Sequence, residues 1–195
     1  MARLTDTRAR MVHTAADLLR RQGYAATGWR QIVSVSRTPW GSQAHHFPGG
    51  KEQIATEALT LAGQRYEALL RATFADVHPA EAVLAWSRYA ARALEASDWA
   101  DGCPVATVAL ETSHTSEPLA LACSSAFAAW STTLTDALAQ RGVPRAEAGR
   151  LATLVLAAVE GALLLARARR SAAPLRAVGR ELAVLLRARV PAPPR

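Results

Sequence analysis

The stretch TPWGSQAHHFPGGKE, residues 38–52, decides how this sequence folds. A threonine followed by a proline is typical of the first turn of a helix, and the Pro-Gly-Gly at 48–50 ends that helix near Phe47. Another short helix is expected just before it, from a cap at Thr27 to about Ser34. Two short helices joined by a tight turn predict a helix-turn-helix, whose second member enters the major groove of DNA.

The residue types in this stretch suit a helix that lies against DNA. Glycine and serine at its leading end let the backbone approach closely, the indole can cover base edges or sugars, and the remaining polar side chains can donate to phosphates. The lysine opens the next helix, where its ammonium and the free backbone N–H groups can hold the same phosphate. The expected contacts in this stretch are Thr38, Trp40, Gly41, Ser42, His45 and Lys51.

The distribution of charge indicates a polyanionic partner. Residues 1–51 hold eight of the 23 basic residues but only two of the 16 acidic ones, so +6 of the chain's net +7 lies in its first quarter. Such an asymmetry favours binding to nucleic acid. A solvated basic surface is the alternative interpretation.

The rest of the chain predicts an all-α fold of about nine helices. Apolar residues recur at helical spacing, and no stretch keeps a period of two. The first helix is expected to start at a cap formed by Thr5 or Asp6 and to stop at Gly23. Long helices are expected at about 51–74, 80–97, 104–114, 117–141, 145–170 and 175–189. The expected domains are a helix-turn-helix domain at 1–50, a ligand-binding and dimerisation domain at 51–190, and a disordered tail at 191–195.

The sequence does not indicate an enzyme. It contains no paired nucleophile and base, no phosphate-binding glycine loop and no nicotinamide fingerprint. Glu111 and His114 have the spacing used in di-iron bundles, but that site needs two such motifs and no other glutamate here precedes a histidine by three. His45 and His46 point about 100° apart on a helix, with nothing nearby to complete a metal site. We therefore expect no catalytic residues, no metal and no cofactor.

The protein is expected to be cytoplasmic and to have no membrane partner. Its longest apolar tract, Leu151 to Ala166, has 16 residues, fewer than the roughly 20 that span a bilayer. The N-terminus lacks the apolar core of a secretory signal. Two cysteines, Cys103 and Cys123, do not form a disulfide framework and are interpreted as small core residues.

Three segments resemble the TetR family of repressors, most closely its LmrA/YxaF-like branch: GWRQIV at 28–33, HHFPGGKEQIATEAL at 45–59 and GCPVATVALE at 102–111. The resemblance extends over essentially the whole chain. It implies an N-terminal DNA-binding domain, a C-terminal regulatory domain with a ligand cavity, and a dimer formed by the last two long helices. The DNA contacts that carry over by position are Thr27, Arg30, Trp40, Gly41, Ser42, Ala44, His45 and Lys51.

Several of these positions leave alternatives open. Trp40 could be a core residue, and Arg30 could simply be solvated. Arg37 stands where the family has glycine in the turn, and a left-handed conformation costs a larger residue about 1–2 kcal/mol, so the turn is expected to be reshaped. Gln43 and Ala44 replace the family's frequent Leu-Tyr pair, which removes a phenol that commonly reaches phosphate.

The C-terminal half supplies candidates for an effector site and for a dimer interface. Small residues around large aromatic ones can leave a cavity between bundle helices, although ordinary core packing is the alternative. Apolar stripes on the last two helices exceed what one small domain needs, which predicts a two-fold four-helix interface. The effector candidates are Trp86, Tyr89, Glu111, His114, Phe127 and Trp130. The interface candidates are Leu151, Leu154, Val155, Ala158, Ala162, Leu165, Leu182 and Leu186.

Together these features predict a homodimeric repressor of transcription. It would bind double-stranded DNA at a palindromic operator and leave it when a small lipophilic or aromatic effector binds. The alternative is a small-molecule-binding dimer on the same scaffold whose DNA binding is weak or lost, because Arg37, Gln43 and Ala44 depart from the family pattern.

Overall fold

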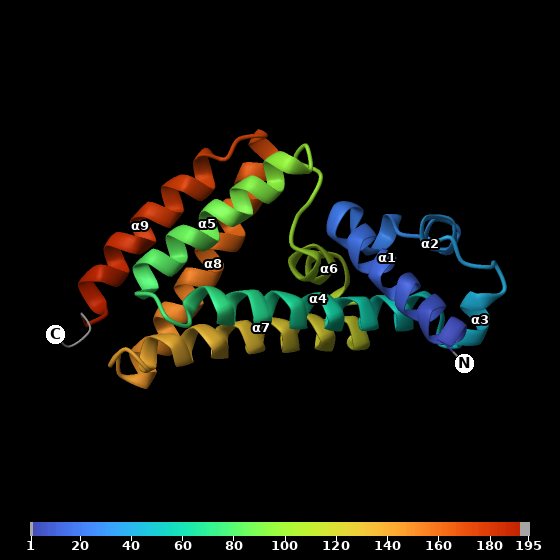
Figure 1. Ribbon diagram of the computed structural model, residues 1–195, viewed down its shortest axis with the longest axis horizontal. Helices are drawn as coiled ribbons and strands as arrows, with labels where there is room; N and C mark the ends of the chain where they lie inside the picture. The colour runs from blue at the N-terminus through green and yellow to red at the C-terminus, as the bar shows by residue number, and fades with distance from the viewer. Residues whose placement is uncertain (1, 192–195) are drawn as a thin grey trace. The chain divides into compact units, whose positions relative to one another are not determined.

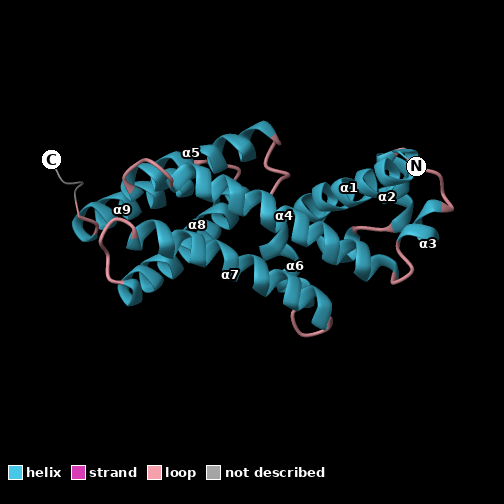
Figure 2. Cartoon of the chain, turned by 60° about the horizontal axis from the view of Figure 1, so that its bottom comes forward, coloured by secondary structure: helices cyan, strands magenta, loops and turns pink. Residues whose placement is uncertain are grey.

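The computed structural model describes residues 2–191, and this part of the chain contains nine α-helices and no strand (Figures 1 and 2). The predicted all-α fold is therefore confirmed. The expected disordered tail lies, from residue 192 onward, outside the described residues. The helices are α1 (Ala2–Ala26), α2 (Trp29–Ser36), α3 (Ser42–His46), α4 (Gly50–Phe74), α5 (Pro79–Ala96), α6 (Pro104–Thr112), α7 (Glu117–Ala139), α8 (Arg145–Arg169) and α9 (Ala173–Arg189).

The ends of the long helices lie close to their predicted positions because proline and glycine mark them. Pro79 and Pro104 occupy the first turns of α5 and α6, where a missing backbone N–H costs nothing. Gly23 kinks α1 with a φ of 79° and a ψ of −174°, but the helix continues to Ala26, so the predicted stop marks a kink and not the end of the helix. The predicted start was wrong, because α1 begins at Ala2.

The two short helices begin later than expected. Gly28 is the N-cap of α2, and no side chain caps it. Thr27 is instead buried, and its hydroxyl donates a hydrogen bond of 2.6 Å to the carbonyl of Gly23. The Thr-Pro pair at 38–39 does not begin α3, because the Pro39 carbonyl accepts the N–H of Ser42 in a turn of its own. Trp40 therefore lies in the turn before α3 and not on the helix.

The helices pack as two compact units. The first consists of the chain up to Arg65 together with Cys103–Phe127, so it contains α1–α3, the first turns of α4, α6 and the first half of α7. In this unit α1 packs against both α2 and α6 (Figure 1). Its core is apolar and includes Met11, Leu19, Ile32, Phe47, Ile54, Leu59 and Leu119. By packing, α6 thus belongs with the helix-turn-helix, although it lies beyond the functional boundary expected at residue 50.

The second unit consists of Tyr66–Gly102 and the chain from Ala128 onward. In it α5, α8 and α9 lie side by side (Figure 1). Ion pairs join α9 to α5, such as Arg176 with Glu95 at 3.0 Å. These pairs are exposed and contribute little to stability. What holds the unit together is its apolar core, which includes Trp86, Leu94, Trp130, Leu134, Leu175 and Leu186.

Helix α8 is longer than the apolar tract seen in the sequence. Its 25 residues include a window with a mean hydropathy of 1.8, so by length and composition alone it could cross a membrane. The 16-residue tract at 151–166 therefore understated the length of the apolar helix. A helix that packs in a core or an interface meets the same criteria, and α8 packs against α5 and α9.

Candidate nucleic-acid interface

Arg37 keeps the turn between α2 and α3 in a left-handed conformation. Its φ of 52° and ψ of 46° are those of a glycine-type helix end, and its N–H bonds to the Ser34 carbonyl at 3.2 Å. The N–H of Thr38 bonds to the Val33 carbonyl at 3.2 Å, which satisfies a second carbonyl at the end of α2. The expected reshaping of the turn was wrong. The chain instead retains the turn and places a strained arginine in it.

Replacing Arg37 by glycine is expected to stabilise the protein. Loss of the Cβ removes roughly 1–2 kcal/mol of left-handed strain, and the greater freedom of glycine in the unfolded chain offsets part of this, leaving a gain of about 0.5–1 kcal/mol. Urea unfolding followed by circular dichroism measures the difference. Arg30→Gly, in the right-handed backbone of α2, is the matched control and should lower stability by up to ~1 kcal/mol. Equal effects of the two substitutions would contradict the assignment of strain to Arg37.

The outer surface of α2 and α3 carries most of the predicted DNA contacts. Arg30, Trp40, Gly41 and His45 are exposed, and Ser42 is half-buried at the start of α3. The indole of Trp40 is 56% exposed, so it is not a core residue. This surface therefore offers a cation, a flat apolar ring and an open backbone within a few residues of one another.

Two predicted contacts point inward. Thr27 and Thr38 are buried. The Thr27 hydroxyl is engaged with Gly23, and the Thr38 hydroxyl lies 2.9 Å from that of Ser36. Both threonines thus hold the ends of α2 in place, and neither offers its side chain to an outside partner.

Gln43 also turns inward, although it lies on α3, the helix expected to enter the groove. Its amide oxygen is buried, and no donor among the described residues reaches it. The position is occupied by leucine in the family pattern, which suits a side chain that turns toward the core. We therefore assign Gln43 to packing.

Lys51 is engaged within its own unit. Its ammonium lies 4.2 Å from the centre of the Tyr24 ring and donates to the Ala25 carbonyl at 3.4 Å. Burial lowers the pKa of the lysine, and the nearby carboxylate of Glu111 acts in the opposite direction. The ammonium therefore joins the start of α4 to the end of α1.

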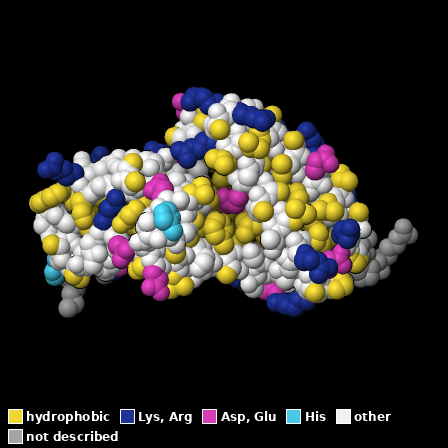
Figure 3. Space-filling view, turned by 180° about the vertical axis from the view of Figure 1, so that it is seen from behind, with side chains coloured by type: hydrophobic (Ala, Val, Ile, Leu, Met, Phe, Trp, Pro, Cys, Tyr) yellow, Lys and Arg dark blue, Asp and Glu magenta, His cyan; other side chains and the backbone are white. Residues whose placement is uncertain are grey.

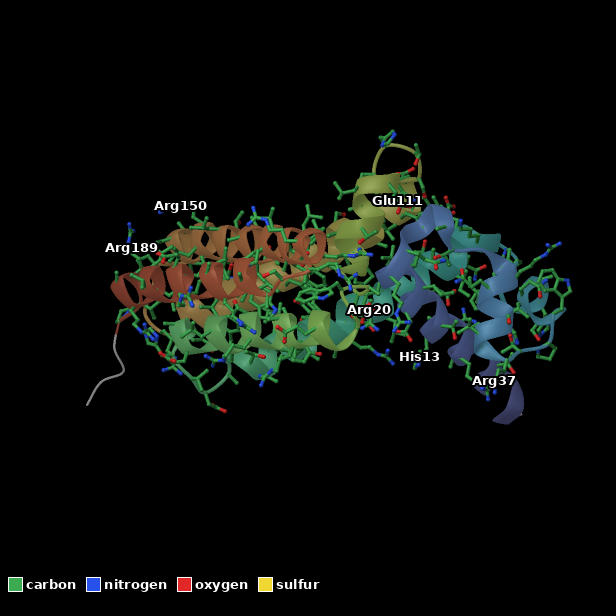
Figure 4. The ribbon with its side chains drawn as sticks, turned by 90° about the horizontal axis from the view of Figure 1, so that it is seen from above. His13, Arg20, Arg37, Glu111, Arg150 and Arg189 are labelled. Carbon is green, nitrogen blue, oxygen red and sulfur yellow. The ribbon has the colours of Figure 1, made fainter. Side chains whose placement is uncertain are left out.

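Glu111 completes this junction from α6. Its Oε2 accepts the backbone N–H of Ala25 at 2.7 Å. Figure 4 labels Glu111 on α6. The side chain fits only because residue 23 is glycine, since a Cβ built there would lie 1.8 Å from Glu111 Oε1. Ser116 makes a second link, donating from its hydroxyl to Glu52 of α4 at 2.7 Å. No sequence pattern pointed to Tyr24, Glu52 or Ser116, because each acts through a neighbour that is distant along the chain.

The effector candidates do not form one group. Trp86 and Trp130 are buried and are joined by Tyr66, whose hydroxyl accepts the Trp86 Nε1–H at 2.7 Å and whose ring centre lies 4.7 Å from that of Trp130. Tyr89 belongs to the same unit but is 50% exposed. The other candidates, Glu111, His114 and Phe127, belong to the first unit, where Glu111 is engaged with α1 and His114 is exposed.

The interface candidates divide into two sets. Leu151, Val155, Ala162, Leu182 and Leu186 are buried within their own chain, so a partner cannot cover them. Leu154 and Leu165 are about half exposed, and Ala158 is half-buried. The exposed residues of α8 recur every three or four positions and form one mostly apolar stripe. The α8 stripe consists of Arg150, Thr153, Leu154, Ala157, Gly161, Leu164, Leu165 and Ala168.

The chain is similar to known transcriptional regulators over nearly its whole length. Residues 79–181 match the family model of the transcriptional regulator LmrA/YxaF-like, C-terminal domain. The chain is 35% identical to the uncharacterized HTH-type transcriptional regulator YxaF of Bacillus subtilis, over 93% of this chain and 96% of that one. It is also 35% identical to the HTH-type transcriptional regulator LmrA of the same organism, over 87% and 91% of the two chains.

Solved structures agree with this similarity. A TetR transcriptional regulator from Chloroflexus aurantiacus superposes with a TM-score of 0.79 at 27% identity, over 97% of this chain and 98% of that one. A TetR-family regulator from Agrobacterium tumefaciens gives a TM-score of 0.80 at 25% identity, over 96% and 100% of the two chains.

Proposed function

Because this chain belongs to the TetR family of DNA-binding transcriptional regulators, in its LmrA/YxaF-like branch, we propose that it is a ligand-responsive repressor. Members of this family are not enzymes. The proposed partners are a palindromic operator in cytoplasmic DNA, a second copy of the chain, and a small lipophilic or aromatic effector.

The observation that carries the proposal is the exposed surface of α2 and α3 on a basic segment. The left-handed turn at Arg37 holds the two helices as a helix-turn-helix. The first helix of such a pair crosses the DNA backbone, and the second lies in the major groove. Arg30 on α2 and His45 on α3 are both exposed, as these two tasks require.

The α8 stripe supports the proposed dimer. A row of alanine, glycine and leucine on an exposed helix face is costly in water and suits close packing against an identical helix. Val184 of α9 is also 61% exposed and extends the available apolar surface. Figure 3 shows apolar side chains scattered over the whole visible face of the molecule. A two-fold dimer would present two copies of α3 to successive major grooves, about 34–36 Å apart.

The effector is proposed to act on the helix-turn-helix through α4, because this helix has residues in both units. The proposed effector is a flat apolar molecule that would stack on the aromatic group of Tyr66, Trp86 and Trp130, which must open to admit it because both indoles are buried. In the first unit, Lys51 at the start of α4 and Glu111 near the end of α6 both bond to Ala25 at the end of α1. An effector that tilts α4 would therefore move the helix-turn-helix with it, and DNA would weaken effector binding by the same factor.

Selection of bound sequences from a pool of random duplexes tests the proposal. The expected result is a palindromic sequence that the protein retards in a gel, with an affinity that falls steeply as salt rises. Flat aromatic compounds that raise the melting temperature of the protein should then release the duplex. A dimer that binds such compounds but selects no duplex even at low salt would overturn the repressor function in favour of a small-molecule-binding dimer.

A further inference from the structure

The surface of the first unit contains an open depression between α2 and the turn before α3. It is lined by Arg30, Val33, Ser34 and Trp40. The first three lie within one turn of α2, and Trp40 lies beyond the left-handed residue Arg37. The left-handed turn redirects the chain after α2, and the Trp40 side chain lines the same depression as α2.

The lining combines two donors with an apolar ring. Neither the Arg30 guanidinium nor the Ser34 hydroxyl makes a hydrogen bond or ion pair with the described part of the chain, and both residues are exposed. Val33 is 7% exposed and forms the floor, and the indole of Trp40 is 56% exposed. No carboxylate lines the depression. Its charge and shape therefore suit an anionic group attached to a compact apolar ring.

We propose that this depression holds one deoxyribose-phosphate of the operator backbone. The sugar packs on the Trp40 indole, and the phosphate accepts hydrogen bonds from Arg30 and Ser34. Arginine binds phosphate oxygens in pairs, and serine hydroxyls are common donors to the DNA backbone. The inference rests on the proposed function, and it assigns to Trp40 the task of positioning the protein without reading a base.

The position of the donors favours the backbone over a base edge. Arg30 and Ser34 belong to α2, the helix that crosses the backbone in a helix-turn-helix, whereas α3 is the helix that enters the groove. Trp40 precedes α3 and lines the same depression as these donors. The competing role for the indole is contact with a thymine methyl group, which would make it a base reader.

Neutralising single phosphates of the selected operator tests the proposal. With methylphosphonate at one position in each half-site, the wild-type protein should lose about tenfold in affinity. Arg30→Ala and Ser34→Ala proteins should lose much less there, because the contact is already absent. Arg30→Ala should also reduce the slope of affinity against salt by about one. Equal losses for the wild type and Arg30→Ala at every phosphate would overturn the assignment.

Trp40→Ala distinguishes the backbone role from base reading. It should weaken binding to the selected and to unrelated duplexes by the same factor, with an unchanged salt slope and an unchanged selected sequence. Val35→Ala is the matched control, since Val35 is also exposed on α2 but does not line the depression. A different selected sequence, or a loss that disappears in duplexes in which uracil replaces thymine, would make Trp40 a base reader and overturn the inference. Failure of the wild type to bind any duplex would overturn the proposed function itself.

Discussion

Gly23→Ala is expected to lower the free energy of unfolding by about 3 kcal/mol, combining backbone strain of roughly 1–3 kcal/mol with the loss of a charged hydrogen bond. The φ of 79° and ψ of −174° at this residue lie in a region that only glycine adopts freely. An added methyl group would also meet the carboxylate of Glu111, which must then leave the N–H of Ala25. Urea unfolding measures the effect.

A double-mutant cycle separates the two contributions. Glu111→Ala alone should cost about 1 kcal/mol, and it should cost less in the Gly23→Ala background, where the hydrogen bond is already broken. Gly149→Ala, in the helical backbone of α8 with open space around it, is the matched control. It should be neutral or stabilise by up to about 1 kcal/mol. A Gly23→Ala protein as stable as the wild type would show that residue 23 does not need glycine.

Gly161→Arg is expected to convert the proposed dimer to a monomer. Gly161 lies in the middle of the α8 stripe, and a Cβ built there meets nothing within 4 Å in its own chain. The monomer should therefore fold normally, while an arginine on the stripe prevents close approach of a second α8. Because two linked half-site contacts gain roughly 10²–10⁴-fold in affinity over one, operator binding should fall by at least about 100-fold.

Light scattering and gel retardation measure these two effects. Gly161→Ala is the control, because a methyl group is tolerated at a helix–helix contact and the backbone gains helix propensity. It should remain dimeric and bind the operator. A Gly161→Arg protein that stays dimeric, with its circular dichroism spectrum unchanged, would show that the α8 stripe is not the interface.

The contacts around Gly23 also bear on the proposed response to an effector. Lys51 and Glu111 connect α4 and α6 to the end of α1 through short polar contacts. Because Glu111 of α6 is hydrogen-bonded to Ala25 of α1, a displacement of α6 would be transmitted to α1. The proposed effector response would therefore depend on residues that touch neither effector nor DNA.

The sequence by itself determined the helices and their class. Helical spacing of apolar residues predicts the long helices, and proline or glycine at 79, 104 and 142 fixes several of their ends, because these residues act through the local backbone. It also predicted a helix-turn-helix with Arg30, Trp40 and His45 as contacts, but it left open whether Trp40 was buried, and the structure shows that it is exposed. Local patterns did not fix the first residues of α2 and α3, because Thr27 and Thr38 found hydrogen-bond partners other than the helix ends.

Only the tertiary structure decided which residues each side chain contacts and which apolar residues are buried within their own chain. It turned Glu111 and Lys51 toward the end of α1, and it buried Leu182 and Leu186 within their own chain. An apolar residue at helical spacing can face either its own core or a second subunit, and the spacing is the same in both cases. A carboxylate can likewise reach a backbone N–H 86 residues away only after the helices have packed. These choices depend on contacts between distant segments, so no local pattern in the sequence records them.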